Sequence, residues 1–225
     1  MKVAVLGTGM VGQALAGKLA ELNHAVTIGT RDPKATLART TPDGMGTPPL
    51  KGWLDQHAQV KLATFAEAAA GAELLVNATS GRGALEALQS AKAHLDGKVL
   101  VDISNPLDFS KGMPPTLSVC NTDSLGEQLQ RAFPTLKVVK TLNTVNANLM
   151  VNPKLLAGGE HTMLLCGDDA AAKSQVTALL KSFGWSDVLD LGGIANARAS
   201  EMYLATWVRL YGTLKTPMFS IKVVR

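Results

Sequence analysis

The chain begins with a short apolar run that leads directly into a glycine-rich segment. The run Lys2 to Leu6 does not alternate between polar and apolar residues, as expected of a strand buried on both faces. It is followed by Gly7-Thr8-Gly9-Met10-Val11-Gly12 and then by apolar residues at helical spacing up to Leu22. A GxGxxG segment between a strand and a helix is typical of the first turn of a doubly wound α/β fold that binds a dinucleotide.

Each glycine of this segment has its own role in such a turn. Gly7 permits the tight bend after the strand, Gly9 lets the backbone approach a pyrophosphate, and Gly12 lets the helix and the strand pack closely. The free N–H groups at the start of the helix favour the phosphate charge. The alternative, a turn that only joins a strand to a helix, is the less favoured interpretation.

Apolar runs and helical stretches follow one another along most of the remaining chain. Further strands are predicted over 24–29, 73–77, 98–103, 137–142, 161–166 and 186–191, and helices over 66–70, 84–94, 170–183 and 194–211. This order predicts an α/β fold with a Rossmann-type, doubly wound parallel sheet. We expect residues 1–150 to form the dinucleotide-binding domain and residues 151–225 a small C-terminal α/β extension that completes the acceptor cleft. Two segments rich in proline and glycine, 40–59 and 105–115, are predicted to be loops.

The composition argues against several functional classes. The 225 residues are 46% hydrophobic and 18% charged, as in ordinary globular proteins, and every apolar run is shorter than the roughly 20 residues that a membrane helix needs. The basic residues behind the net charge of +4 are dispersed, so a nucleic-acid partner is not favoured. The opening residues are too few for a signal peptide, which predicts a cytoplasmic protein.

Cysteine and histidine positions do not indicate a metal site. Cys120 and Cys166 lie far apart without a metal-ligand pattern, and we expect both thiols to be reduced and buried. His57, His94 and His161 stand in a predicted loop, at a helix end and at a strand start. Solvated side chains are expected at all three positions.

The end of the second strand carries the residues that distinguish NADP from NAD. An NAD site usually has an acidic residue there for the ribose hydroxyls, whereas this chain has Thr30 and Arg31. Arg31 can form a charge-assisted fork with a 2′-phosphate, Thr30 can hydrogen-bond to it, and Lys34 adds positive charge. Asp32 is the objection, because its carboxylate can contact a ribose, but its place before Pro33 is typical of a helix N-cap. NADP is therefore preferred over NAD.

Several longer segments form a pattern that covers nearly the whole chain. They are Lys2 to Gly9, Ile28 to Arg31, Val101 to Leu107, Lys140 to Thr144, Cys166 to Asp169, Leu189 to Gly192, Asn196 to Arg198 and Met218 to Lys222. In these segments the chain resembles the coenzyme F420-dependent NADP oxidoreductases, and its first half is also similar to the NADPH-binding domain of Steap metalloreductases. It departs from the family at Ala78-Thr79-Ser80, where members that reduce the deazaflavin often have Ile-Pro-Trp, and at Asn143, where they often have histidine.

The resemblance implies hydride exchange between NADPH and a deazaflavin, coenzyme F420, or a flavin such as FMN or FAD. By position, the residues facing the pyrophosphate would be Thr8, Gly9, Met10 and Val11, and those facing the 2′-phosphate would be Thr30, Arg31 and Lys34. Residues bordering the nicotinamide would be Asn77, Ala78, Thr79, Ser80, Asn105 and Pro106 on one side, and Asn143 with Thr144 to Ala147 on the other. Met218 and Phe219 would line the acceptor pocket.

Asn77, Asn105 and Asn143 all fall at or just after predicted strand ends, where ligands of such sheets bind. Their amides can hydrogen-bond to a nicotinamide or a flavin carbonyl but do not transfer protons. The alternative for each asparagine is that it caps a turn. Because hydride transfer between two rings depends mainly on positioning, we predict no catalytic acid or base. Tyr211 and Lys215 have the spacing of a short-chain dehydrogenase pair, but they stand where a helix is ending and are not expected to be catalytic.

Two other functions stay open from the sequence. One is a small carbonyl or imine reductase, which calls for a catalytic lysine and a long helical second domain that residues 151–225 are too few to form. The other is a non-catalytic NADP(H)-binding redox sensor, with which the missing acid or base is compatible. Trp207, Arg209 and Tyr211 of the last predicted helix favour packing or a homodimer interface.

Overall fold

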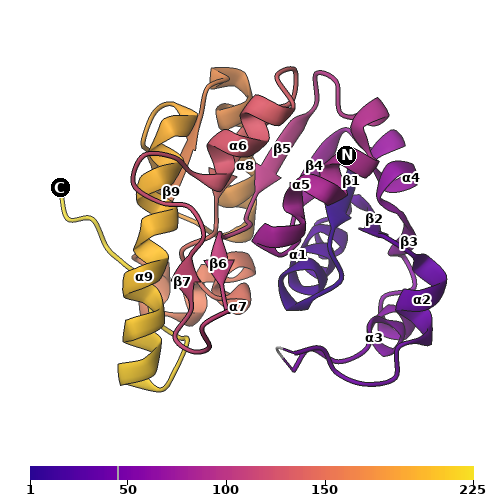
Figure 1. Cartoon of the computed structure of the whole chain (residues 1–225), viewed down its shortest axis with the longest axis horizontal. Helices are drawn as coiled ribbons and strands as arrows, with labels where there is room; N and C mark the ends of the chain where they lie inside the picture. The colour runs from indigo at the N-terminus through magenta and orange to yellow at the C-terminus, as the bar shows by residue number, and fades with distance from the viewer. Residues whose placement is uncertain (45) are drawn as a thin grey trace.

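The computed structural model describes residues 1–44 and 46–225, which form an eight-stranded sheet with helices on both faces (Figure 1). The strand order is β10-β9-β8-β5-β4-β1-β2-β3. The strands are β1 (Lys2–Leu6), β2 (Ala25–Thr30), β3 (Lys61–Thr64), β4 (Leu74–Asn77), β5 (Val99–Asp102), β8 (Lys137–Thr141), β9 (Thr162–Gly167) and β10 (Asp187–Asp190). A separate hairpin pairs β6 (Leu107–Asp108) with β7 (Thr116–Leu117).

The helices alternate with the strands along the chain. They are α1 (Met10–Glu21), α2 (Pro33–Ala38), α3 (Leu50–Gln56), α4 (Phe65–Ala70), α5 (Gly81–Ser90), α6 (Leu125–Ala132), α7 (Ala147–Val151), α8 (Ala170–Phe183) and α9 (Ala197–Leu214). Short 3-10 segments cover Lys92–His94, Pro153–Leu155, Ala157–Gly159 and Ile194–Asn196. The predicted α/β class and Rossmann-type sheet are confirmed.

Two apolar cores cover the two faces of the sheet. Successive side chains of a strand point to opposite faces, and the alternate residues of β1 accordingly enter different cores. Val3 and Val5 belong to the core that includes α1, α7 and α8, while Ala4 and Leu6 belong to the core that includes α4, α5 and α6. Burial on both faces explains why β1 reads as a continuous apolar run.

The sheet departs from the predicted parallel arrangement at one place. β8 and β9 pair antiparallel, whereas the other neighbouring strands are parallel. If β9 were parallel to β8, the chain would have to return to the opposite end of the sheet, which needs a long crossover, usually a helix. The helix between the two strands, α7, has only five residues. β9 therefore starts at the end of the sheet where β8 stops. The 14 residues of α8 then provide a full crossover to β10.

Both segments predicted to be loops contain regular structure. In the segment 40–59, which includes one residue outside the described part of the chain (Met45), α3 buries Leu50 completely. Pro49 is the N-cap of this helix, so the proline that suggested a loop marks a helix start. The segment 105–115 contains β6, and the unpredicted edge strand β3 pairs with β2.

Two side chains differ from the predicted exposure. Cys166 is buried in β9, and burial raises the pKa of its thiol to about 12, but Cys120 is exposed in the irregular stretch before α6.

His94 is exposed as expected and His57 stacks on Trp53, whereas the expectation of a solvated His161 is wrong. Its ring nitrogens lie 3.0 Å from Ser220 Oγ and 3.0 Å from the Pro153 carbonyl, because the C-terminal segment covers it.

No helix within residues 1–44 and 46–225 combines the length and the apolar character needed to cross a membrane.

Candidate functional site: a glycine loop and an amide cluster at the carboxyl ends of the strands

The glycine loop has the close contacts that its sequence predicts. Gly7 has a φ of 125°, and a Cβ on it would collide with the Ala78 carbonyl. A Cβ on Gly12 would likewise collide with the Gly7 carbonyl. At Gly9, by contrast, the nearest atom to a Cβ would be Asp43 Oδ2 at 3.9 Å. The loop is therefore packed tightly on its inner side and open at Gly9, as a pyrophosphate cradle requires.

The start of α1 leaves its first N–H groups without a side-chain cap. Gly9 is the N-cap, and there is no acidic residue in the first turn. Met10 is half-exposed, and Gln13 Nε2 donates to the Thr8 carbonyl at 3.0 Å, which holds the loop in shape. Uncapped N–H groups and the positive end of a 12-residue helix suit a phosphate group.

The end of β2 shows how Asp32 is used. Its Oδ1 accepts hydrogen bonds from the backbone N–H of Lys34 at 2.8 Å and of Ala35 at 3.1 Å, with Pro33 at the first helical position. Asp32 is thus the N-cap of α2, as predicted, and its Oδ1 is engaged by the backbone of that helix. Thr30 Oγ1 lies 2.8 Å from Thr36 Oγ1.

Arg31 extends from the end of β2 toward α5. Its side chain is 75% exposed, and its Nε and Nη2 lie 3.2 Å and 3.1 Å from Glu86 Oε1. A cavity of about 260 Å³ adjoins the pair, lined by Arg31, Thr64, Phe65, Ala66, Glu86 and Ser90. Exposed ion pairs contribute little free energy, so a ligand phosphate can replace the Glu86 carboxylate at small cost.

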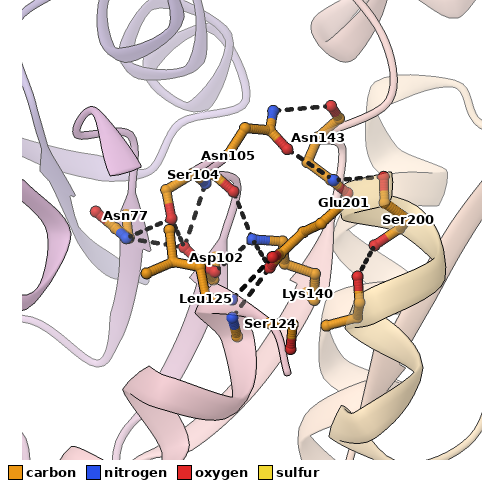
Figure 2. A network of polar contacts seen from close by, with 12 residues as sticks. Asn77, Asp102, Ser104, Asn105, Ser124, Leu125, Lys140, Asn143, Ser200 and Glu201 are labelled. Carbon is orange, nitrogen blue, oxygen red and sulfur yellow. Dashed lines mark hydrogen bonds and ion pairs between the residues drawn. The ribbon is translucent and has the colours of Figure 1, made fainter. Parts of the chain in front are cut away.

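The three predicted asparagines lie in two adjacent hydrogen-bonded groups, one with Asn105 and Asn143 and one with Asn77, and we call the three side chains the amide cluster (Figure 2). Asn105 Nδ2 donates to the Asn143 carbonyl and Asn143 Nδ2 donates to Asn105 Oδ1, each at 3.0 Å. Asn143 Nδ2 also donates to the Ser200 carbonyl at 3.1 Å. Asn77 Nδ2 donates to Asp102 Oδ1 and Ser104 Oγ, at 2.8 Å and 3.3 Å.

The loops that carry the amide cluster also contact the glycine loop. Asn77 Oδ1 accepts a hydrogen bond from Thr79 Oγ1 at 2.6 Å, which shapes the segment after β4 that packs on Gly7. A Cβ on Gly81, at the start of α5, would collide with the Asn105 carbonyl. The ends of β1, β4, β5 and β8 therefore meet at one edge of the sheet. Arg31 and Lys34 follow β2, which pairs in parallel with β1 and ends at the same edge.

Beneath the amide cluster lies a buried ionic network that was not predicted from the sequence. Lys140 Nζ lies 2.8 Å from Asp102 Oδ2 and 2.9 Å from Glu201 Oε1, and it donates to the Ser104 carbonyl. Burial alone would lower the pKa of Lys140, but the two carboxylates outweigh it and raise the pKa above its ordinary value. A lysine within the apolar strand Val138-Val139-Lys140 and an acid ending Val99–Asp102 were the available signals.

The C-terminal segment packs against the start of α7 and against α9. Asn146 caps α7, and its Nδ2 donates to the Pro217 carbonyl at 2.6 Å. Phe219 is buried against Trp207, with ring centroids 5.1 Å apart. Lys215 has a left-handed backbone and ends α9, so the Tyr211–Lys215 pair stands at a helix end as expected.

The fold and this edge of the sheet define a class, the Rossmann-fold dinucleotide-binding proteins. Residues 2–106 match the family model described as "NADP oxidoreductase coenzyme F420-dependent". A crystal structure from Arthrobacter sp. FB24, provisionally named an F420-dependent NADP reductase, is 59% identical over the full length of both chains, with a TM-score of 0.95. The chain belongs to the coenzyme F420-dependent NADP oxidoreductase family and is an NADP-dependent oxidoreductase.

Two curated relatives show the same likeness. The F420-dependent NADP reductase of Methanothermobacter marburgensis is 28% identical over 207 residues, which cover 89% of this chain and 88% of that protein. Metalloreductase STEAP3 of Rattus norvegicus is 31% identical over 217 residues, which cover 96% of this chain. The match spans only 38% of that longer protein.

Proposed function

We propose that this protein transfers a hydride between NADPH and a deazaflavin of the F420 type or a flavin such as FMN or FAD. The observation that carries the proposal is the amide cluster, which places Asn77, Asn105 and Asn143 in two adjacent hydrogen-bonded groups beside the glycine loop. When bound, NADPH supplies the hydride, and a ring acceptor takes it without an enzyme acid or base. The names of the Arthrobacter and Methanothermobacter proteins support F420 as the acceptor.

The NADP preference rests on the end of β2. Arg31 and Lys34 are exposed cations, and Asp32 Oδ1 is engaged by the backbone of α2. We assign the 2′-phosphate to Thr30, Arg31 and Lys34. The cavity beside Arg31 and Phe65 offers space for the adenosine.

The amide cluster would position the two rings rather than move protons. Both N–H groups of the Asn143 side chain are engaged, by Asn105 Oδ1 and the Ser200 carbonyl, which fixes its orientation. Ala78, Thr79 and Pro106 would border the nicotinamide from β4 and β5, and Ala147 from α7. Residues 151–225 would complete the acceptor side through Met218 and Phe219.

Anaerobic NADPH oxidation by the purified protein tests the acceptor. F420, FMN, FAD and a ferric chelate are offered in parallel, with NADH as the coenzyme control. Turnover with F420 or a flavin supports the proposal. Tight NADPH binding without turnover of any acceptor contradicts hydride transfer to these rings and favours the redox-sensor function.

We also propose a cytoplasmic homodimer. Met202, Tyr211 and Leu214 are exposed on α9, and exposed apolar side chains on one helix favour an interface. Size-exclusion chromatography with light-scattering detection measures the mass of the protein in solution. A monomer at every concentration contradicts the proposed homodimer.

A further inference from the structure

The ionic network under the amide cluster has unequal numbers of charges. One ammonium, that of Lys140, contacts two carboxylates, those of Asp102 and Glu201. All three side chains are at most 1% exposed, so water does not screen them.

Both carboxylates have surroundings that suit the ionised form. Every polar contact described for them comes from a donor, and these donors are Asn77 Nδ2, the Ser104 N–H and O–H, the N–H groups of Leu125 and Gly126, and Lys140 Nζ. The oxygens of both side chains therefore act as acceptors, and the group consists of one ammonium and two carboxylates. The network therefore carries one net negative charge.

Neighbouring groups do not cancel this charge. The Cys166 thiol is the nearest titratable side chain of β9, and burial, opposed by Lys140, raises its pKa to about 12, so it stays neutral. Glu127 is paired with Arg198 and Asp190 with Lys173, and each pair is neutral by itself. The N-terminus of α6, which donates to Glu201, offsets part of the charge with partial positive charge only.

The network lies where the nicotinamide is proposed to bind. Asp102 ends β5 and bonds directly to Asn77, and Glu201 follows Ser200, whose carbonyl holds Asn143 (Figure 2). The two carboxylates thus connect to the amide cluster from both sides. This placement of the nicotinamide rests on the proposed function.

We propose that the buried Lys140–Asp102–Glu201 network stabilises bound NADP+ relative to bound NADPH. The nicotinamide ring is neutral in NADPH and cationic in NADP+, because a hydride, one proton with two electrons, has left for the acceptor. A fixed negative charge nearby favours the cation and thus lowers the affinity for NADPH relative to NADP+. The residues of the network make NADPH the better hydride donor and direct the reaction toward reduction of the acceptor.

Paired binding measurements test this inference. The dissociation constants of NADP+ and NADPH are measured by calorimetry for the wild type, Asp102→Asn and Glu201→Gln. A unit charge about 10 Å away at an effective dielectric constant of about 20 changes relative affinity roughly tenfold. Each variant is expected to lose NADP+ affinity relative to NADPH by about that factor. Damage to the fold would instead lower the affinity for both NADP+ and NADPH.

Glu127→Gln is the matched control, because it removes the same charge from a pair outside the network. An unchanged ratio in both network variants, or an equal change in the control, overturns the inference and leaves the proposed function standing. A wild type that binds neither nucleotide overturns both. If neither network variant folds, the wild type decides: tighter binding of NADP+ supports the inference, and tighter binding of NADPH overturns it.

Discussion

Two charged regions of this molecule, the Arg31–Glu86 pair and the Lys140–Asp102–Glu201 network, differ in exposure and in hydrogen bonding. The Arg31–Glu86 pair lies in solvent, with side chains 75% and 67% exposed. The Lys140–Asp102–Glu201 network is wholly enclosed, and its carboxylates bind backbone and side-chain donors from several elements. An exposed pair is weak and exchangeable, whereas a buried charge cannot lose its partner without a large free-energy penalty.

The difference in exposure indicates which charged side chains can bind a ligand directly. Arg31 can release Glu86 and receive a phosphate because water compensates both groups during the exchange. Lys140 has no such freedom, so its network acts through its field and through the side chains that it holds in place. Four substitutions test this contrast, in decreasing order of effect.

Lys140→Met should have the largest effect, on stability. The substitution leaves Asp102 and Glu201 buried without their cation, which typically costs about 3–5 kcal/mol. Urea denaturation measures the loss. Lys173→Met, which breaks the more exposed pair with Asp190, is the control and should lose no more than about 1 kcal/mol. Equal losses in the two variants would show that burial does not separate the two kinds of charge.

Arg31→Glu should come next, with its effect confined to the coenzyme. Reversing the charge removes the phosphate fork and adds repulsion, so NADPH affinity should fall by roughly 100-fold. Fluorescence titration measures the change, with NADH as the control because it lacks the 2′-phosphate. An unchanged NADPH affinity would remove Arg31 from the site.

The Glu127–Arg198 pair, intermediate in exposure, should show a pH-dependent effect. The hydrogen bonds from Arg198, opposed by burial, hold the pKa of Glu127 below its ordinary value of 4.5. The stability that the ionised carboxylate provides is therefore present above pH 4.5 and is lost as the pH falls through the lower folded-state pKa. Glu127→Gln should destabilise the protein at pH 7, and the difference from wild type should shrink below pH 4.5. A difference in unfolding free energy that is the same at every pH would contradict this assignment.

Glu86→Gln should have the smallest effect. The neutral amide releases Arg31 more readily, so NADPH affinity should rise by about two- to threefold at low salt, and the gain should vanish at high salt. A titration series in increasing salt measures both parts. A loss of affinity would mean that Glu86 orients Arg31 for the phosphate.

The fold was predictable where the signal is local. The glycine loop, β1 and α1 follow from consecutive residues, and so does the capping of α2 by Asp32. The antiparallel β9 depends on how far the chain travels after β8, which a residue pattern does not state. The helix α3 was hidden by the prolines that precede it, although Pro49 is its N-cap.

The candidate site likewise has one part that was predicted from the sequence and one part that only the fold reveals. The asparagines were visible because each ends a strand or follows one closely, and the structure places them in two adjacent hydrogen-bonded groups. The ionic network joins residues 38 and 61 positions apart, from Asp102 to Lys140 and from Lys140 to Glu201. Nothing local in the sequence links Glu201 of α9 to Lys140 of β8, so this part required the fold.

The capping of α2 makes coenzyme choice inseparable from folding. An engineer who seeks an NAD-dependent variant would remove Arg31 and rely on the neighbouring acid for the ribose. Asp32 already accepts hydrogen bonds from the N–H groups of Lys34 and Ala35, and releasing it would destabilise the first turn of α2. A switch of coenzyme therefore requires a second acid introduced at the end of β2, with Asp32 retained, and replacement of Arg31 by an acid is the substitution that meets both conditions.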